Sequence, residues 1–187
     1  CSKNSDGELE WVRKTFIRKD NITLQGFCTL TNNYQLPAAF NNNNKAPYDI
    51  SIDYGSATIS AATTKNSSAW FRAGGYMARA NGVISSARLQ ITNNNSANDF
   101  VVAMVKWSPD VAVITSYPVV LFEKTVNGQS SASKIVSYGL SSTVAGEFVN
   151  TAITAGDHIM LMIKGIDVEG EGDLVFAVAS FDIGWDS

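Results

Sequence analysis

Apolar and polar residues alternate in short runs along most of the chain beyond residue 48, and residues typical of turns separate the runs. In residues 83–92 most odd positions are apolar and most even positions are polar. Because successive side chains of a strand point to opposite faces, this run predicts a strand with one face on a core and the other in water. Helix-type periodicity is scarce, so the pattern predicts an all-β fold, an antiparallel β-sandwich of the jelly-roll kind. The expected strands are residues 49–54, 57–62, 69–79, 83–92, 99–107, 111–122, 133–139, 147–154, 157–165 and 173–183.

Three runs are apolar at odd and even positions alike: FVVAMVKW at 100–107, HIMLMIK at 158–164 and LVFAVASF at 174–181. We expect residues 157–183 to form two strands joined by an acidic, glycine-spaced loop. A strand that is apolar on both faces must be covered on both. If a neighbouring subunit is one of the covers, each Å² of apolar surface that it buries contributes about 25 cal/mol to the free energy of association. The other interpretation is a cover of loops and the N-terminal arm. The candidate residues for an oligomer interface are Met160, Met162, Phe176 and Val178.

The first 48 residues lack this regular pattern. Residues 21–45 are rich in Asn, Thr and Gln, which favours turns and exposed backbone over core. Residues 9–19 fit neither a clean helix nor a clean strand. We therefore expect an extended N-terminal arm at residues 1–48, which serves for attachment, and a β-sandwich domain at residues 49–187.

The chain has 187 residues, of which 45% are hydrophobic, and this is enough for one domain with a core. The formal net charge of -3 disfavours a general nucleic-acid-binding surface. No apolar run approaches the roughly 20 residues of a transmembrane helix.

The two cysteines, Cys1 and Cys28, favour free thiols over a disulfide framework. Cys1 as the first residue has three interpretations. Loss of an initiator Met and proteolytic processing are favoured over the third, the lipid-bearing cysteine of a bacterial lipoprotein.

Motifs for catalysis are absent from the sequence. His158 is the one histidine, and Asp157 beside it would point to the opposite face of a strand, so a Ser-His-Asp arrangement is not expected. We interpret His158 as a structural or interface residue. The two carboxylates of a hydrolytic pair are close in space but have no fixed spacing in the sequence. Glu123 and Glu147 are therefore candidates for such a pair only by default. We expect no enzyme and no cofactor.

Two weaker binding candidates lie near the C-terminus. The loop DVEGEGD at 167–173 sets four carboxylates at alternating positions, and oxygen ligands suit calcium. Its order and length are not those of an EF-hand, so a solvated hairpin tip is favoured. Trp185, past the last expected strand, is the candidate for stacking on a sugar ring of a glycan. The metal candidates are Asp167, Glu169, Glu171 and Asp173.

In residues 76–109, YMARANGVISSARLQITNNNSANDFVVAMVKWSP, the turn dipeptide Asn81-Gly82 precedes two long expected strands. The sequence AGD at 155–157 then opens the penultimate strand, and FAVASFDI closes the chain at 176–183. These patterns resemble the β-sandwich domains of fibre, head-fibre and decoration proteins on tailed-bacteriophage virions. The jelly-roll heads of the C1q and tumour-necrosis-factor type are similar. The resemblance covers residues 70–183 and includes no functional motif, so it supplies no site residues.

The resemblance implies a virion structural protein on the particle surface, commonly a homotrimer, whose N-terminal part fastens to capsid or tail proteins. A host cell-surface glycan is a further expected partner. The alternative is a carbohydrate-binding module or a lipid-anchored bacterial surface lipoprotein, which would predict an exposed aromatic platform and a lipidated Cys1.

Overall fold

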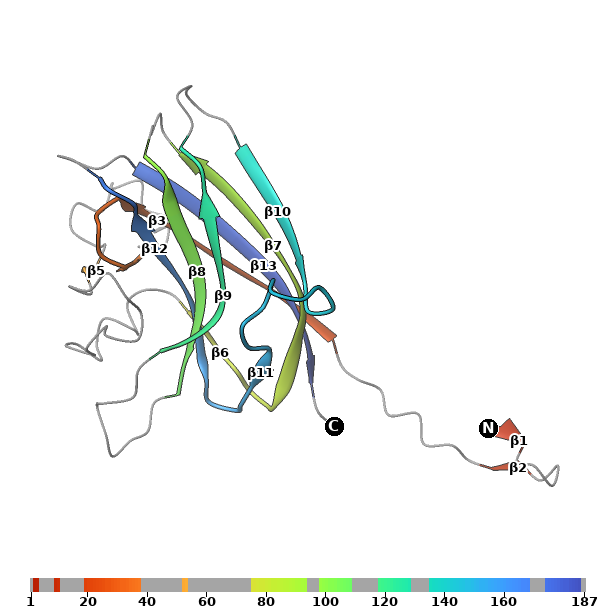
Figure 1. Cartoon of the computed structure of the whole chain (residues 1–187). Helices are drawn as coiled ribbons and strands as arrows, with labels where there is room; N and C mark the ends of the chain where they lie inside the picture. The colour runs from red at the N-terminus through yellow and green to blue at the C-terminus, as the bar shows by residue number, and fades with distance from the viewer. Residues whose placement is uncertain are drawn as a thin grey trace, which may run out of the picture.

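The structure is a computed structural model that describes residues 2–3, 9–10, 19–37, 52–53, 75–93, 98–108, 118–128, 135–168 and 174–185. In these ranges the chain forms strands, turns and bends without a helix. Two antiparallel sheets face each other (Figure 1), so the predicted all-β sandwich is confirmed. A short pair, β1 (Ser2–Lys3) and β2 (Leu9–Glu10), forms a sheet of its own.

One sheet has five strands in the order β10-β7-β13-β3, and β11 also pairs with β7. All eleven residues of β3 pair with β13, from Lys19 opposite Gly184 to Thr29 opposite Leu174. The strands of this five-stranded sheet are β3 (Lys19–Thr29), β7 (Gly82–Asn93), β10 (Ile135–Ser141), β11 (Ala152–Ile153) and β13 (Leu174–Trp185).

The other sheet has six strands in the order β5-β4-β12-β8-β9, and β6 also pairs with β12. The chain passes from one sheet to the other between β3 and β4, β6 and β7, β7 and β8, β9 and β10, β11 and β12, and β12 and β13, which is the alternation of a jelly roll. The strands of this six-stranded sheet are β4 (Gln35–Leu36), β5 (Ile52–Asp53), β6 (Tyr76–Met77), β8 (Phe100–Trp107), β9 (Val119–Val126) and β12 (His158–Gly165).

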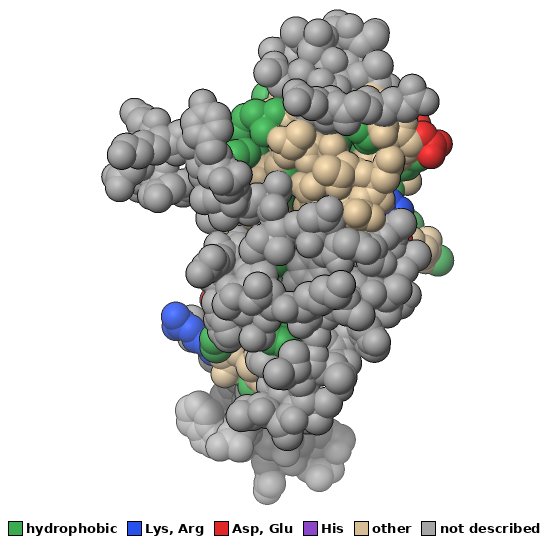
Figure 2. Space-filling view, turned by 90° about the vertical axis from the view of Figure 1, so that its left-hand side faces the viewer, with side chains coloured by type: hydrophobic (Ala, Val, Ile, Leu, Met, Phe, Trp, Pro, Cys, Tyr) green, Lys and Arg blue, Asp and Glu red, His purple; other side chains and the backbone are tan. Residues whose placement is uncertain are grey.

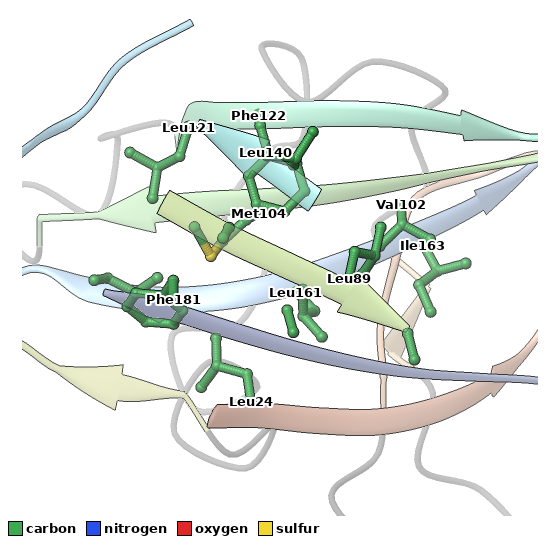
Figure 3. Packing of buried hydrophobic residues seen from close by; sticks show 14 of the residues in the cluster. Leu24, Leu89, Val102, Met104, Leu121, Phe122, Leu140, Leu161, Ile163 and Phe181 are labelled. Atoms are coloured by element: carbon green, nitrogen blue, oxygen red, sulfur yellow. The ribbon is translucent and has the colours of Figure 1, made fainter. Parts of the chain in front are cut away.

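Side chains from both sheets fill the space between them (Figure 3). Leu89 and Phe181 come from the five-stranded sheet, while Met104, Phe122 and Leu161 come from the six-stranded sheet. None of the five is more than 5% exposed. Because each fully buried side chain of this size contributes roughly 1.5–3 kcal/mol, this shared core is the main force that holds the two sheets together.

The expected boundary between arm and sandwich is corrected by β3 and β4. Both strands fall within residues 1–48, yet each pairs inside a sheet. Leu24 and Cys28 of β3 point into the core and are 6% and 2% exposed. Cys28 is a free thiol, and its burial raises its pKa to about 12. Residues 19–37 therefore belong to the sandwich, because β13 supplies a partner for a segment whose own pattern is weak.

One expected local connection is also absent from the described strands. We expected β12 and β13 as one two-strand unit, but β12 lies between β4 and β8, whereas β13 lies between β7 and β3. The turn dipeptide Asn81-Gly82 connects β6 and β7, which belong to different sheets. Asn81 Oδ1 accepts a hydrogen bond from the amide of Ala155 at 2.9 Å. The expected strand at 111–122 overlaps β9 at residues 119–122, and its residues 111–117 lie outside the described residues. The expected strand at 57–62 lies outside the described residues.

Gly82 allows β7 and β13 to approach closely where β7 begins. A Cβ atom at this position would lie 2.6 Å from the Gly184 carbonyl oxygen and 2.9 Å from Trp185 Cε3. We expect Gly82→Ala to lower the free energy of unfolding by about 1–3 kcal/mol, because backbone must shift to admit the methyl group. Urea unfolding measures this loss. Gly139→Ala is the matched control, since a Cβ at Gly139 meets nothing within 4 Å; equal losses at the two glycines would contradict the close approach.

Candidate functional site

The outer face of the six-stranded sheet is buried within the single chain along β12 and β8, whereas Glu123 and Thr125 at its β9 end are exposed. Met160 and Met162 of β12 are 2% and 0% exposed. We predicted both at an oligomer interface, and the structure corrects this, because neither side chain is accessible to a second subunit. We call this surface the closed face; its buried apolar residues are Tyr34, Leu36, Ala103, Val105, Trp107, Met160 and Met162.

Tyr34 links the two ends of the closed face. It directly precedes β4, and its hydroxyl donates a hydrogen bond of 2.6 Å to Glu123 Oε1 on β9, while β12 and β8 lie between these strands. The Lys164 ammonium lies 5.0 Å from the centre of the Tyr34 ring, within the range of a cation–π contact. Burial and the neighbouring Glu123 carboxylate raise the pKa of Tyr34, so its hydroxyl keeps the proton that it donates.

Replacing Tyr34 with phenylalanine is expected to lower the free energy of unfolding by about 1–2 kcal/mol, because the hydrogen bond to a carboxylate is lost while the ring stays. A double-mutant cycle of Tyr34→Phe with Glu123→Gln, followed by urea unfolding, measures the coupling between the two side chains. Additive losses would show that the two groups do not hold the sheet together.

The outer face of the five-stranded sheet is open. Along β13 odd-numbered residues are buried, whereas the even-numbered residues between them are partly exposed. The strand registers extend this second set into four rows across β10, β7, β13 and β3, and none of the sixteen residues is fully buried. These rows define the open face: Ile135, Thr92, Phe176 and Phe27; Ser137, Gln90, Val178 and Gln25; Gly139, Arg88, Ser180 and Thr23; Ser141, Ser86, Asp182 and Asn21.

The first row makes one end of the open face apolar. Phe176 and Phe27 pair across β13 and β3 with ring centres 5.7 Å apart. Ile135 on β10 is 68% exposed, and Val178 follows in the next row. Phe176 and Val178, which we predicted at an oligomer interface, are therefore partly exposed and available for contact. Phe27 and Ile135 were not predicted as site residues, although β3 alternates from residue 22 onwards and could have been identified by that signal.

The last row of the open face is polar and hydrogen-bonded. Asp182 accepts hydrogen bonds of 2.7 Å from the Asn21 amide and the Ser86 hydroxyl. These two bonds lower the pKa of Asp182, so its carboxylate is ionised at neutral pH. The row thus places one fixed negative charge at the opposite end from the apolar row.

Trp185 is not placed for sugar stacking. It is 7% exposed, packs in the core, and donates its indole N–H to Asp20 Oδ2 at 2.8 Å. Its ring also lies 6.3 Å from the ring of Tyr76. Because a glycan platform needs an exposed aromatic face, Trp185 as placed offers none, and its position at the end of the chain did not predict its burial.

The corner before β12 holds the most buried carboxylate in the described core. Asp157 is 1% exposed and accepts hydrogen bonds from the Ser108 hydroxyl, the Thr154 amide at 2.8 Å and the Lys106 ammonium at 3.1 Å. Gly156 has a φ of 92°, which only glycine adopts readily, so it completes the turn. The carboxylate therefore ties this turn to the end of β8.

The charges of this corner suit a structural role. Burial alone would raise the pKa of Asp157, but hydrogen bonds from Ser108, Thr154 and Lys106 and the Lys106 charge outweigh burial and lower it. Burial lowers the pKa of His158, so its imidazole is neutral at neutral pH. An ionised carboxylate held by three donors is a poor proton donor or acceptor, and the corner is suited to fixing the turn.

The other acidic candidates that the structure describes accept hydrogen bonds or lie in turns. Glu123 accepts the Tyr34 bond on β9, while Glu147 accepts a 2.6 Å bond from the Ser141 amide in the turn after β10. Asp167 has a φ of 52° in the turn after β12. Glu169, Glu171 and Asp173 lie outside the described residues. Within the described ranges no group of three His, Cys, Asp or Glu side chains is placed to hold a metal ion.

Figure 2 shows one side of the molecule, where described side chains reach the surface in small groups of mixed type.

No helix in the described ranges is long and apolar enough to cross a membrane. Comparison with known proteins found no matching family model and no matching curated protein.

Proposed function

We propose that this chain is a non-enzymatic structural protein of a virion surface, a fibre or decoration component of a tailed bacteriophage that acts by shape-complementary binding. One observation carries the proposal: the sandwich is closed on one outer face and open, with an apolar end, on the other. Such a one-sided sandwich is suited to lie against another protein surface, because exposed apolar residues gain free energy when a partner covers them.

Two further points support a structural role. The acidic side chains that catalysis would need, Asp157, Glu123 and Glu147, accept hydrogen bonds that hold strands and turns. Residues 70–183 resemble phage surface domains, and this resemblance favours a virion over other surfaces as the structure to which the sandwich binds. Because one fold serves many functions, this second point is an analogy.

In the proposed arrangement the chain forms a homotrimer on the particle. Residues 1–18, which precede β3, attach it to capsid or tail proteins, and the loops at the ends of the sandwich meet the host surface or its glycans. Its place of action is the virion surface.

Labelling of virions tests the proposal. An antibody is raised against the purified chain and coupled to gold. Intact phage particles from the organism that encodes the chain are then labelled and imaged. The gold should decorate regular positions on the head, tail or fibres. Particles without label, with the chain found in the host envelope fraction instead, would overturn the proposal in favour of a bacterial surface protein. A glycan array with the purified chain then separates host attachment from particle stabilisation.

A further inference from the structure

We propose that copies of this chain contact one another through the open face, with the row of Ile135, Thr92, Phe176 and Phe27 as the apolar end of the contact. This inference rests on the proposed assembly function. A contact between two open faces joins copies in pairs, so it is separate from the contacts that would hold the proposed trimer together. The closed face cannot serve, because its apolar residues are already covered in one chain.

The composition of the open face resembles the core of a protein interface. Its first two rows hold two phenylalanines, an isoleucine and a valine among uncharged polar side chains, and none of their eight residues is charged. Interface cores are depleted of charge and enriched in aromatic residues. A nucleic acid would instead require a basic surface, so the first two rows favour a protein partner.

The two charges of the open face make it complementary to itself. Arg88 is the only cation of the sixteen residues and Asp182 the only anion, and they lie in adjacent rows on adjacent strands. Arg88 is exposed, and Asp182 is ionised and partly exposed. Arg88 of one copy can therefore pair with the Asp182 carboxylate of another, while the apolar rows cover each other. This charge complementarity identifies a second copy of the chain as the partner.

The size of the open face fits such a contact. Four strands spaced by about 4.8 Å, each contributing seven residues of about 3.4 Å, span roughly 19 Å by 24 Å. The projected area of about 450 Å² is more than half of the ~800 Å² that each partner buries in a standard interface. The face is therefore large enough to carry most of one specific contact.

The experiment measures the mass of the full chain by light scattering and sedimentation across a concentration series. Ile135→Glu places a charge in the apolar row at an exposed position, and we expect the dissociation constant between copies to rise about 30-fold or more. Arg79→Glu is the matched control, because Arg79 is an exposed cation outside the open face; its dissociation constant should stay within about twofold of the original. Near-ultraviolet circular dichroism verifies that each variant is folded.

Charge exchange tests the identity of the partner. Arg88→Glu should weaken association about tenfold when alone, because it faces the partner's Asp182. An equimolar mixture of Arg88→Glu and Asp182→Lys chains should recover association, since glutamate and lysine then meet across copies. Recovery in the mixture supports a contact between two open faces. A mixture that stays as weak as Arg88→Glu alone would overturn it.

The outcomes for the surface and for the function are separate. Two results would overturn the inference. In the first, the chain associates but Ile135→Glu does not weaken the association. In the second, the unmodified chain stays at the mass of one chain at every concentration. The gold labelling is unaffected by either result. If the variants behave as expected but virions carry no label, the contact surface stands and the proposed virion function fails.

Discussion

Replacing Met162 with lysine is expected to lower the free energy of unfolding by about 4 kcal/mol or more, a large part of the 5–15 kcal/mol of a typical domain. Met162 is 0% exposed at the centre of the closed face, so the substitution buries an ammonium group among apolar side chains. Urea unfolding at a chain concentration below the range of association measures the loss. Met162→Leu, which keeps the volume, should cost less than about 1.5 kcal/mol.

Val178→Lys is the decisive comparison for this result. Val178 and Met162 were both predicted at an oligomer interface, yet Val178 lies on the open face and is partly exposed. Its lysine variant should lose less than about 1 kcal/mol, because the longer side chain can reach water. A loss at Val178 equal to the loss at Met162 would show that the two outer faces of the sandwich do not differ.

Removal of the Asp157 carboxylate should destabilise the protein by about 3 kcal/mol at neutral pH. Asp157→Ala leaves the Thr154 amide and the Ser108 hydroxyl without their acceptor and the Lys106 ammonium without its counter-charge. Thermal or urea unfolding of the variant measures the loss. Asp182→Ala is the matched control on the open face, where water can replace the carboxylate, and should cost about 1 kcal/mol or less.

The contribution of Asp157 should also depend on pH. Because folding lowers the pKa of Asp157, the ionised carboxylate stabilises the native state at any pH above its unfolded value of about 3.9, and this stability is lost as the pH falls through the folded pKa. The difference in unfolding free energy between the original chain and Asp157→Asn should therefore shrink from pH 7 to pH 2.5. A difference that stays constant over this range would show that the charge of Asp157 contributes nothing.

The positions of five of the seven long strands in the described ranges could be predicted because the signal is local. β7, β8, β10, β12 and β13 lie within two residues of the expected bounds at both ends. In each of them the apolar residues repeat at a period of two or fill both faces, and the pleat of a strand imposes that pattern regardless of its neighbours. β3 was missed because its Thr, Gln and Asn residues occupy the exposed side of an edge strand, where polar residues are tolerated and resemble a loop.

The candidate site could be predicted only in part. Phe176 and Val178 lie on the open face, whereas Met160 and Met162 lie on the closed face. The four residues look alike in sequence, since each is an apolar residue on the second face of an apolar strand. Trp185 shows the same ambiguity, because an aromatic ring can pack in a core or stand exposed, and its contact with Asp20 comes from 165 residues away in the chain.

The amino-acid sequence by itself determined that the chain forms antiparallel strands, where five of the seven long strands that the structure describes begin and end, and which strands are apolar on both faces. These properties depend on the alternation of neighbouring side chains along each strand. The tertiary structure alone decided which strands lie side by side, that β3 completes the five-stranded sheet, and which outer face is covered. Those outcomes depend on contacts between residues far apart in the chain, and the free energy of such contacts is set by the whole packed arrangement and not by any one segment.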